Sequence, residues 1–263
     1  MTDKTEYPEL NYNEILKTRD TIHGYAKLLG AIRGSMTPPQ KDHWHISLRT
    51  GPLGFRTTPI PIGDGHTFEI LLDLVSHSVE ITTSKGYTWS TPIEGQSLAV
   101  FSKNLLSELG KLGIKPGIDT SKFKDETERD YNFQHATDIF RFYSIFDMVL
   151  KEFNGTLTQE TSPVQLWPHH MDIAFTCHTG AGLLITCGFL TGDGSIEEPY
   201  FYITAYPELD DISSITPGGK AYWRTGDWQG VILKYGDLME ADSPTGELLD
   251  HLKNTFNQIM EKA

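Results

Sequence analysis

The chain has 263 residues, of which 38% are hydrophobic and 11% aromatic, and this composition excludes disorder as its main state. Its formal net charge is −13, with acidic residues spread over both halves. That balance argues against nucleic acids and anionic membranes as partners, because both are bound through an excess of Lys and Arg. The sequence has neither an apolar run of membrane-spanning length nor a signal-like N-terminus, so we expect a soluble, cytoplasmic protein.

The first part of the chain predicts a long helix, several strands and a second helix. Apolar residues recur every three or four positions from Tyr12 into the low thirties, which is typical of an amphipathic helix. Alternating polar and apolar residues then predict a strand over residues 43–49, followed by a loop rich in Gly and Pro. A hairpin is expected at 68–83, and a helix at 98–112.

The second part begins with a charged segment, residues 122–130, which we expect to be a solvated connector. A helical stripe over 135–153 follows, and then a strand over 170–178 in which polar and apolar residues alternate strictly. Ser243 and Pro244 have the residue types preferred at the N-cap and first position of a helix, so the last helix is expected to begin there. The strands predicted between these two elements are 182–190, 199–206, 221–224 and 231–235.

These elements predict an α+β fold with an antiparallel or mixed sheet. The order of elements in residues 1–121 resembles that in 122–263, which indicates two similar halves related by a pseudo-two-fold duplication. Residues 43–48 align with 170–175, and residues 87–91 with 221–225. A single compact domain is the alternative, since the identities between the halves are few.

Polar residues of the two aligned strands form a candidate site. His43, His45, His170 and Asp172 are its centre, and Arg49, Ser47 and His178 its rim. A His held by an Asp can act as a general base near neutral pH, and the planar guanidinium of Arg suits a carboxylate or phosphate. A His pair on one strand face also suits a metal ion. Tyr202 belongs to a strand face of Tyr and Thr residues that either lines a pocket or packs on the sheet.

Three longer motifs support a resemblance to a known family. They are Trp44-His45-Ile46-Ser47-Leu48-Arg49, Ser162–Trp167 with Met171–Ala174, and Glu198–Tyr202 with Ala205–Pro207. Over nearly its whole length the chain resembles an uncharacterised bacterial family of domains of unknown function. The resemblance implies no activity, but its motifs include His45, Arg49 and Asp172, whereas His43 and His170 are particular to this chain. Arg129 stands where the resemblance leads us to expect His.

Our leading hypothesis is that a cleft between the two halves binds a small anionic molecule. Arg49 would anchor the anion, and His45 with Asp172 would be an acid–base pair if the chain is an enzyme, which the sequence does not decide. One alternative is a non-catalytic protein-interaction module that uses exposed aromatic residues such as Trp223 and Trp228. Another is a metal-dependent enzyme. The sequence indicates neither a cofactor nor an oligomeric state.

Overall fold

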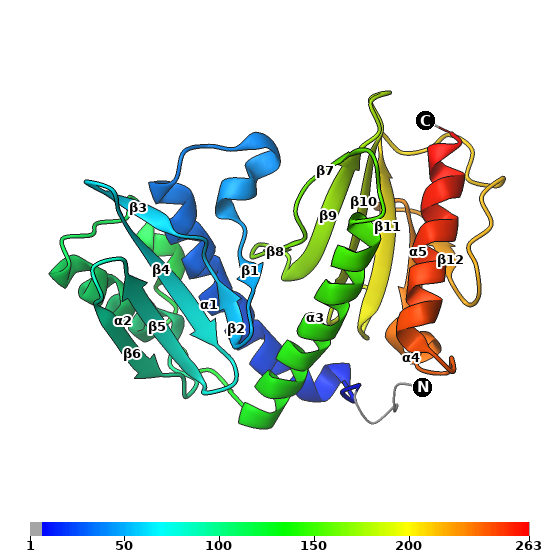
Figure 1. Cartoon of the computed structure of the whole chain (residues 1–263). Coiled ribbons are helices and arrows are strands. Elements are labelled where there is room, and N and C mark those ends of the chain that lie inside the picture. The colour runs from blue at the N-terminus through cyan, green and yellow to red at the C-terminus, as the bar shows by residue number, and fades with distance from the viewer. Residues whose placement is uncertain (1–6, 263) are drawn as a thin grey trace. The chain divides into compact units, whose positions relative to one another are not determined.

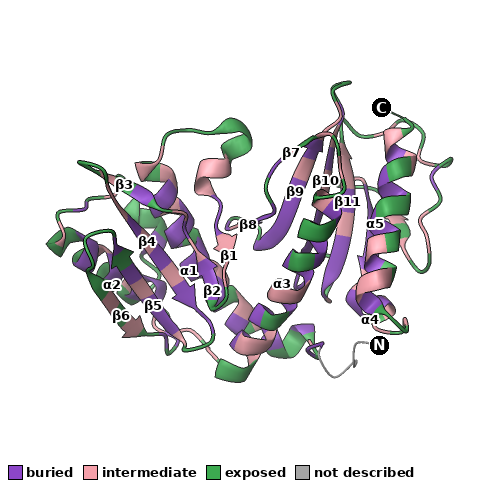
Figure 2. Ribbon diagram, in the orientation of Figure 1, coloured by how far each residue is buried: buried purple, intermediate pink, exposed green. Residues whose placement is uncertain are grey.

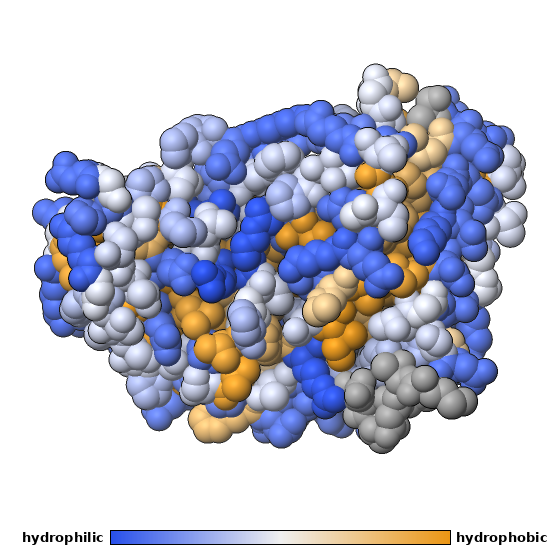
Figure 3. Space-filling model, viewed as in Figure 1, coloured by the Kyte–Doolittle hydropathy of each residue, from blue (hydrophilic) through white to orange (hydrophobic). Residues whose placement is uncertain are grey.

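The computed structural model describes residues 7–262 and shows an α+β protein with two antiparallel sheets, so the predicted fold class is confirmed (Figure 1). None of the described helices has both the length and the apolar character needed to cross a membrane. The surface in view in Figure 3 is mostly hydrophilic, as the composition requires. The helices are α1 (Tyr12–Met36), η2 (Lys41–Ile46), α2 (Leu98–Lys111), η3 (Thr120–Phe123), α3 (Phe133–Asn154), α4 (Tyr235–Leu238) and α5 (Pro244–Met260), where η marks a 3-10 helix.

The chain divides into two compact units, and neither is a continuous segment. The β4 unit, named after its central strand, holds Glu14–Phe140 and Leu166–Met171. Of the described residues, the β10 unit holds 7–13, then Arg141–Gln165 and 172–262. The two sheets do not show the predicted similarity between residues 1–121 and 122–263, and the boundary between those halves stays a prediction.

The sheet of the β4 unit has the strand order β1-β2-β4-β5-β6, with β3 paired to β4. The predicted hairpin is confirmed, because β4 pairs with β5 through Leu72 and Val79. Figure 2 shows buried and half-buried residues alternating along β4, as expected for a strand with one face on a core. The strands are β1 (Arg49–Thr50), β2 (Gly54–Arg56), β3 (Ile60–Gly63), β4 (His66–Asp73), β5 (Ser78–Thr83) and β6 (Thr88–Pro92).

The sheet of the β10 unit follows the order β12-β13-β11-β10-β9-β7. Its core is aromatic, because α3 contributes Phe142 and Phe146 against Phe189 and Phe201 of the sheet. The ring centroids of Phe146 and Phe201 lie 4.7 Å apart at an angle of 70°, an edge-to-face contact. The strands are β7 (Glu160–Thr161), β9 (Asp172–His178), β10 (Leu184–Leu190), β11 (Tyr200–Tyr206), β12 (Tyr222–Arg224) and β13 (Gly230–Lys234), and β8 (Gln165–Trp167) is the strand in which the chain passes between the units.

The prediction of a strand over residues 43–49 is wrong. Residues 41–46 form η2, inside which Asp42 and His43 have φ angles of 51° and 60°. Only Arg49 and Thr50 of this region are in a strand. Polar and apolar residues do alternate here. The backbone nevertheless does not pair in a sheet, because the buried side chain of Arg33 in α1 donates to the carbonyl oxygens of Trp44 and Ser47.

The strand predicted over 170–178 begins two residues later. The backbone N–H groups of His170 and Met171 both donate to the carbonyl oxygen of Trp167, at 3.2 and 2.8 Å. Met171 has a φ of 59°. His170 therefore lies in a turn, and β9 begins at Asp172.

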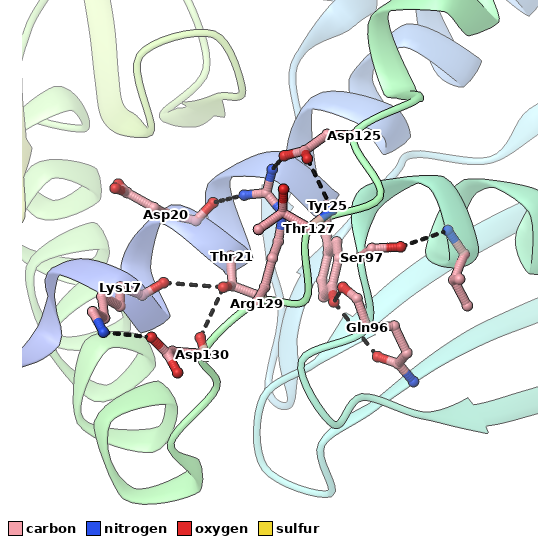
Figure 4. A network of polar contacts seen from close by, with 11 residues as sticks. Lys17, Asp20, Thr21, Tyr25, Gln96, Ser97, Asp125, Thr127, Arg129 and Asp130 are labelled. Carbon is pink, nitrogen blue, oxygen red and sulfur yellow. Dashed lines mark hydrogen bonds and ion pairs between the residues drawn. The ribbon is translucent and has the colours of Figure 1, made fainter.

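The charged connector is anchored on α1, which corrects our expectation of a purely solvated segment (Figure 4). Thr21 donates from its hydroxyl to the carbonyl oxygen of Asp130 at 2.8 Å. Arg129 donates to the carboxylate of Asp125 at 2.8 Å and to the carbonyl oxygen of Asp20 at 3.4 Å. The connector's acidic side chains are exposed, but its backbone has a defined course.

Candidate functional site

Five of the ten histidines lie near one another in the β4 unit. His23 is on α1, His43 and His45 are on η2, and His169 and His170 are in the turn before β9. We call these five residues the histidine cluster. Two segments remote in sequence supply most of it, and they meet through a two-way backbone bridge between Leu48 and Leu166, with N···O distances of 2.9 and 3.0 Å.

The rings of the histidine cluster are close together. The ring centroids of His169 and His170 lie 4.3 Å apart, and those of His43 and His45 lie 6.0 Å apart. His23 Nε2 is 3.2 Å from the carbonyl oxygen of His169. A carbonyl only accepts, so this nitrogen carries a proton and donates it.

Three histidines of the cluster, His23, His45 and His169, favour the neutral imidazole. Burial, with help from the nearby Lys27 ammonium, lowers the pKa of His23 to about 4. Burial also lowers the pKa of His169, and His170, Lys27 and His43 add to that effect. The pKa of His45 is lowered by burial first and then by His43 and Arg33. The leading causes of these three shifts are burial and nearby cationic or imidazole groups.

An apolar pocket of about 420 Å³ opens beside His169. We call it the α1 pocket, and its lining residues are Lys27, Gly30, Ala31, Ile46, Leu98, Lys122, Phe123, Pro168 and His169. A Cβ on Gly30 would lie 2.8 Å from Pro168 Cγ and 2.9 Å from the carbonyl oxygen of Ile46. Glycine at this position therefore lets both segments approach α1 closely.

Two lysines lie at the rim of the α1 pocket. Lys27 and Lys122 are exposed, and within residues 7–262 neither ammonium group has an ion pair or a hydrogen bond. Lys122 belongs to η3, whose N-cap Asp119 accepts from the backbone N–H of Ser121 at 3.0 Å. The connector, residues 122–130, begins within η3 and is anchored on α1. The backbone that carries Lys122 therefore has a defined course.

Arg33 holds the histidine-bearing η2 against α1. Its side chain is buried, with the residue 3% exposed, and Nη1 donates to the carbonyl oxygen of Trp44 at 2.8 Å and to Ser47 Oγ at 3.0 Å. A further bond reaches the carbonyl oxygen of Ser47, and Nε donates to Thr58 Oγ1 at 3.0 Å. Burial and the charge of Arg49 lower the pKa of Arg33 to about 10, so it is still cationic at neutral pH.

The other predicted site residues have different surroundings. His45 Nδ1 accepts the backbone N–H of Gln40 at 3.2 Å, so in the neutral ring its proton is on Nε2. Ser47 is buried as a partner of Arg33, and Arg49 is half-buried in β1. His178 is half-buried at the end of β9. Asp172 belongs to the β10 unit and His45 to the β4 unit, so their pairing stays a prediction.

Asp172 and Tyr202 form a pair within the β10 unit. The Tyr202 hydroxyl donates to Asp172 Oδ2 at 2.5 Å, and the ring crosses the intervening strand at Gly188. A Cβ on Gly188 would lie 2.5 Å from Tyr202 Cζ. Burial and the Asp172 carboxylate raise the pKa of Tyr202 far above its usual value. Tyr202 therefore serves as a hydrogen-bond donor at physiological pH.

The substitution Gly188→Ala is expected to lower the free energy of unfolding of the β10 unit by about 1–3 kcal/mol, because the added methyl forces the Tyr202 ring away from Asp172. Urea unfolding measures the effect. Gly194→Ala is the matched control, since a Cβ there meets no atom within 4 Å. Equal stability of the two variants would contradict the described packing.

The aromatic residues proposed for protein interaction are engaged within the β10 unit. Trp223 Nε1 donates to the carbonyl oxygen of Ile215 at 3.0 Å. The guanidinium of Arg224 lies over the ring of Trp228, 5.0 Å from its centroid. Both tryptophans are half-buried, which corrects their description as exposed residues.

Sequence reasoning missed Lys27, Lys122, His23 and His169 as members of a site. A signal was available for two of them, because His23, Lys27 and Ala31 recur at four-residue steps and so share one face of the predicted helix. No such signal exists for Lys122 or His169, since neither the four-residue 3-10 helix η3 nor a turn is long enough to show a period. Within residues 7–262 no group of three or more His, Cys, Asp and Glu residues is arranged to hold a metal ion.

Comparison with protein families agrees with the resemblance seen in the sequence motifs. The model of a family of unknown function, DUF5996, matches residues 7–183 and 182–263, nearly the whole chain. The chain belongs to DUF5996. This membership confirms the resemblance and, like it, carries no activity for this DUF5996 protein. No curated protein and no solved structure matches it significantly.

Proposed function

We propose that this DUF5996 protein binds a small anionic molecule whose charged group lies between Lys27, Lys122 and His169. The observation that carries the proposal is the pair of exposed lysines that line the α1 pocket, neither of which has an ion pair among the described residues. Other exposed lysines, such as Lys103, also lack an ion pair among these residues, but Lys27 and Lys122 line one apolar pocket together with His169. Asp119 acts on Lys122 through its charge without forming an ion pair, so both ammonium groups can bind an anion from outside the chain.

The neutral histidines suit this role. A neutral imidazole has one N–H donor, so His169 can donate to an anion without adding a charge that Lys27 would repel. A hydrogen bond to a charged group contributes roughly 1.5–3 kcal/mol. Two ammonium groups and one imidazole therefore provide enough binding energy for a small ligand.

The site modifies our earlier hypothesis about the predicted residues. His43 and His170 are retained as ligand-binding residues, because both lie beside His169 in the histidine cluster. His45 is a poor general base, since Nδ1 already accepts from Gln40 and Nε2 carries the ring proton. We therefore propose anion binding as the function, without assigning an acid–base step to His45 and Asp172.

Inorganic phosphate is the probe for this proposal. We expect phosphate to raise the thermal unfolding midpoint of the β4 unit and to shift the NMR signals of His169, because a ligand stabilises the folded state that binds it. In Lys27→Met and Lys122→Met, which keep an unbranched chain without the charge, affinity should fall about tenfold each, or about 1.4 kcal/mol.

Lys103→Met is the matched control, since Lys103 is an exposed lysine of α2 that does not line the pocket. The control also corrects for the general stabilising effect of phosphate, which acts on any folded protein. Equal stabilisation of all four proteins would contradict the proposal.

A further inference from the structure

The α1 pocket extends behind the charged rim and is larger than the anionic group of a ligand needs. Resting on the proposed function, we propose that the ligand is an amphipathic carboxylate whose apolar tail fills the α1 pocket while its carboxylate lies between Lys27 and Lys122. The juxtaposition of an apolar pocket with two exposed lysines that have no ion pair among the described residues supports this class of ligand.

Apart from Lys27, Lys122 and His169, the residues that line the pocket are apolar. They come from four separate elements: α1 provides Ala31, η2 provides Ile46, α2 provides Leu98, and η3 provides Phe123, with Pro168 of the turn before β9 closing the remaining side. The volume of about 420 Å³ falls within the range of roughly 300–1,000 Å³ typical of small-molecule sites. Apart from the rim residues, no lining side chain has a donor or acceptor, so a polar body such as a sugar would lose its hydrogen bonds with water here.

The placement of the charges selects the head group. Lys27 and Lys122 are exposed and line the pocket, and their stems can lie along apolar surface while the ammonium groups stay in water. A ligand with one anionic end and an apolar remainder satisfies the lysines and the walls together. A polyanion would leave charges in the apolar chamber, and a neutral lipid would leave the lysines without a counterion.

Isothermal titration with the full chain, below the micelle concentration of each ligand, tests the inference. Decanoate is expected to bind roughly tenfold more tightly than octanoate, because each buried methylene contributes about 0.8 kcal/mol and tenfold corresponds to about 1.4 kcal/mol. Acetate, which has the charge without the tail, and decanol, which has the tail without the charge, should each bind more than tenfold more weakly than decanoate.

Two variants separate the tail from the head group. Ala31→Phe fills the pocket and should abolish decanoate binding, whereas stabilisation by inorganic phosphate should persist. Val100→Phe is its control, since Val100 is 46% exposed on α2 and does not line the pocket. If Ala31→Phe does not fold, Ala31→Leu makes the same test with a smaller side chain. Lys122→Met should weaken decanoate binding about tenfold and leave decanol binding unchanged.

The outcomes distinguish this inference from the proposed function. Decanoate binding that is no tighter than acetate binding, or that survives in folded Ala31→Phe, would overturn the inference and leave anion binding intact. A different result would overturn both the inference and the proposed function. In it, phosphate does not bind the parent chain, and decanoate binds Lys27→Met and Lys122→Met as tightly as it binds the parent chain.

Discussion

Replacing Arg33 with Met should lower the free energy of unfolding of the β4 unit by about 3–5 kcal/mol. The guanidinium provides the donors for the carbonyl oxygens of Trp44 and Ser47 and for the hydroxyl groups of Ser47 and Thr58. Methionine fills a similar volume but donates nothing, so every one of these acceptors loses a bond, although the carbonyl oxygen of Trp44 keeps the hydroxyl and backbone N–H of Ser47 as donors. The effect is large because one side chain provides several bonds at once.

Hydrogen exchange in the β4 unit, followed during urea unfolding, measures the loss, and the ring signals of His43 and His45 should broaden as η2 is released. Arg33→Lys is informative, because a lysine keeps the charge without the planar fork and should recover only part of the stability. Arg141→Met is the control: Arg141 is an exposed arginine of α3, where surface substitutions change stability by about 0.5 kcal/mol or less. An unchanged η2 in Arg33→Met would show that other contacts hold this helix.

Acidification from pH 6.5 to pH 4 should destabilise the β10 unit by about 3 kcal/mol through His251, since one pKa unit corresponds to about 1.4 kcal/mol. His251 is 4% exposed on α5, and neither ring nitrogen has a hydrogen-bond partner among residues 7–262. Burial lowers its pKa from 6.5 to about 4, and no charged side chain contributes to the shift. The unfolded chain therefore takes up a proton below pH 6.5, and the folded chain does so only near pH 4. Stability is complete above pH 6.5 and falls as the pH drops.

Urea unfolding at several pH values between 4 and 7 measures this dependence. His251→Leu removes the titrating group and should flatten the acid side of the curve. Thr255→Val is the matched control one turn away, because it removes a buried hydroxyl that also has no partner but does not titrate. It should change stability equally at every pH. An acid side as steep in His251→Leu as in the parent chain would assign the effect to other groups.

Local patterns were reliable where an element buries one regular face. The alternation in β4 and β5 and the stripe of α3 were predicted correctly because a core selects apolar residues at the period of the backbone. The start of α5 was predicted equally well, with Ser243 at the N-cap and Pro244 first in the helix. Proline needs no hydrogen-bond partner there, which ties this boundary to the residue itself.

Patterns failed where a distant side chain determines the backbone. Residues 43–49 alternate as a strand should, yet most of them form η2, because Arg33 of α1 binds two of their carbonyl oxygens. The same contact decides where His43 and His45 lie. The alternation of residues 43–49 does not depend on Arg33, a hydrogen-bond donor ten or more residues away. The sequence pattern therefore could not predict the 3-10 helix or the position of its histidines.

The sequence by itself determined the α+β class, most helices and strands, the family and the acidic character of the chain, since each depends on composition or on a repeat within one element. Only the tertiary structure decided the candidate site. It brought His169 beside His23 and made Lys27, Lys122 and His169 line one pocket. These residues come from a helix, a 3-10 helix and a turn that are remote in sequence, and they meet because Gly30 admits the close approach of two segments and Arg33 holds one of them. Contacts of this kind depend on packing between elements, and the periodicity of residues along one element does not predict them.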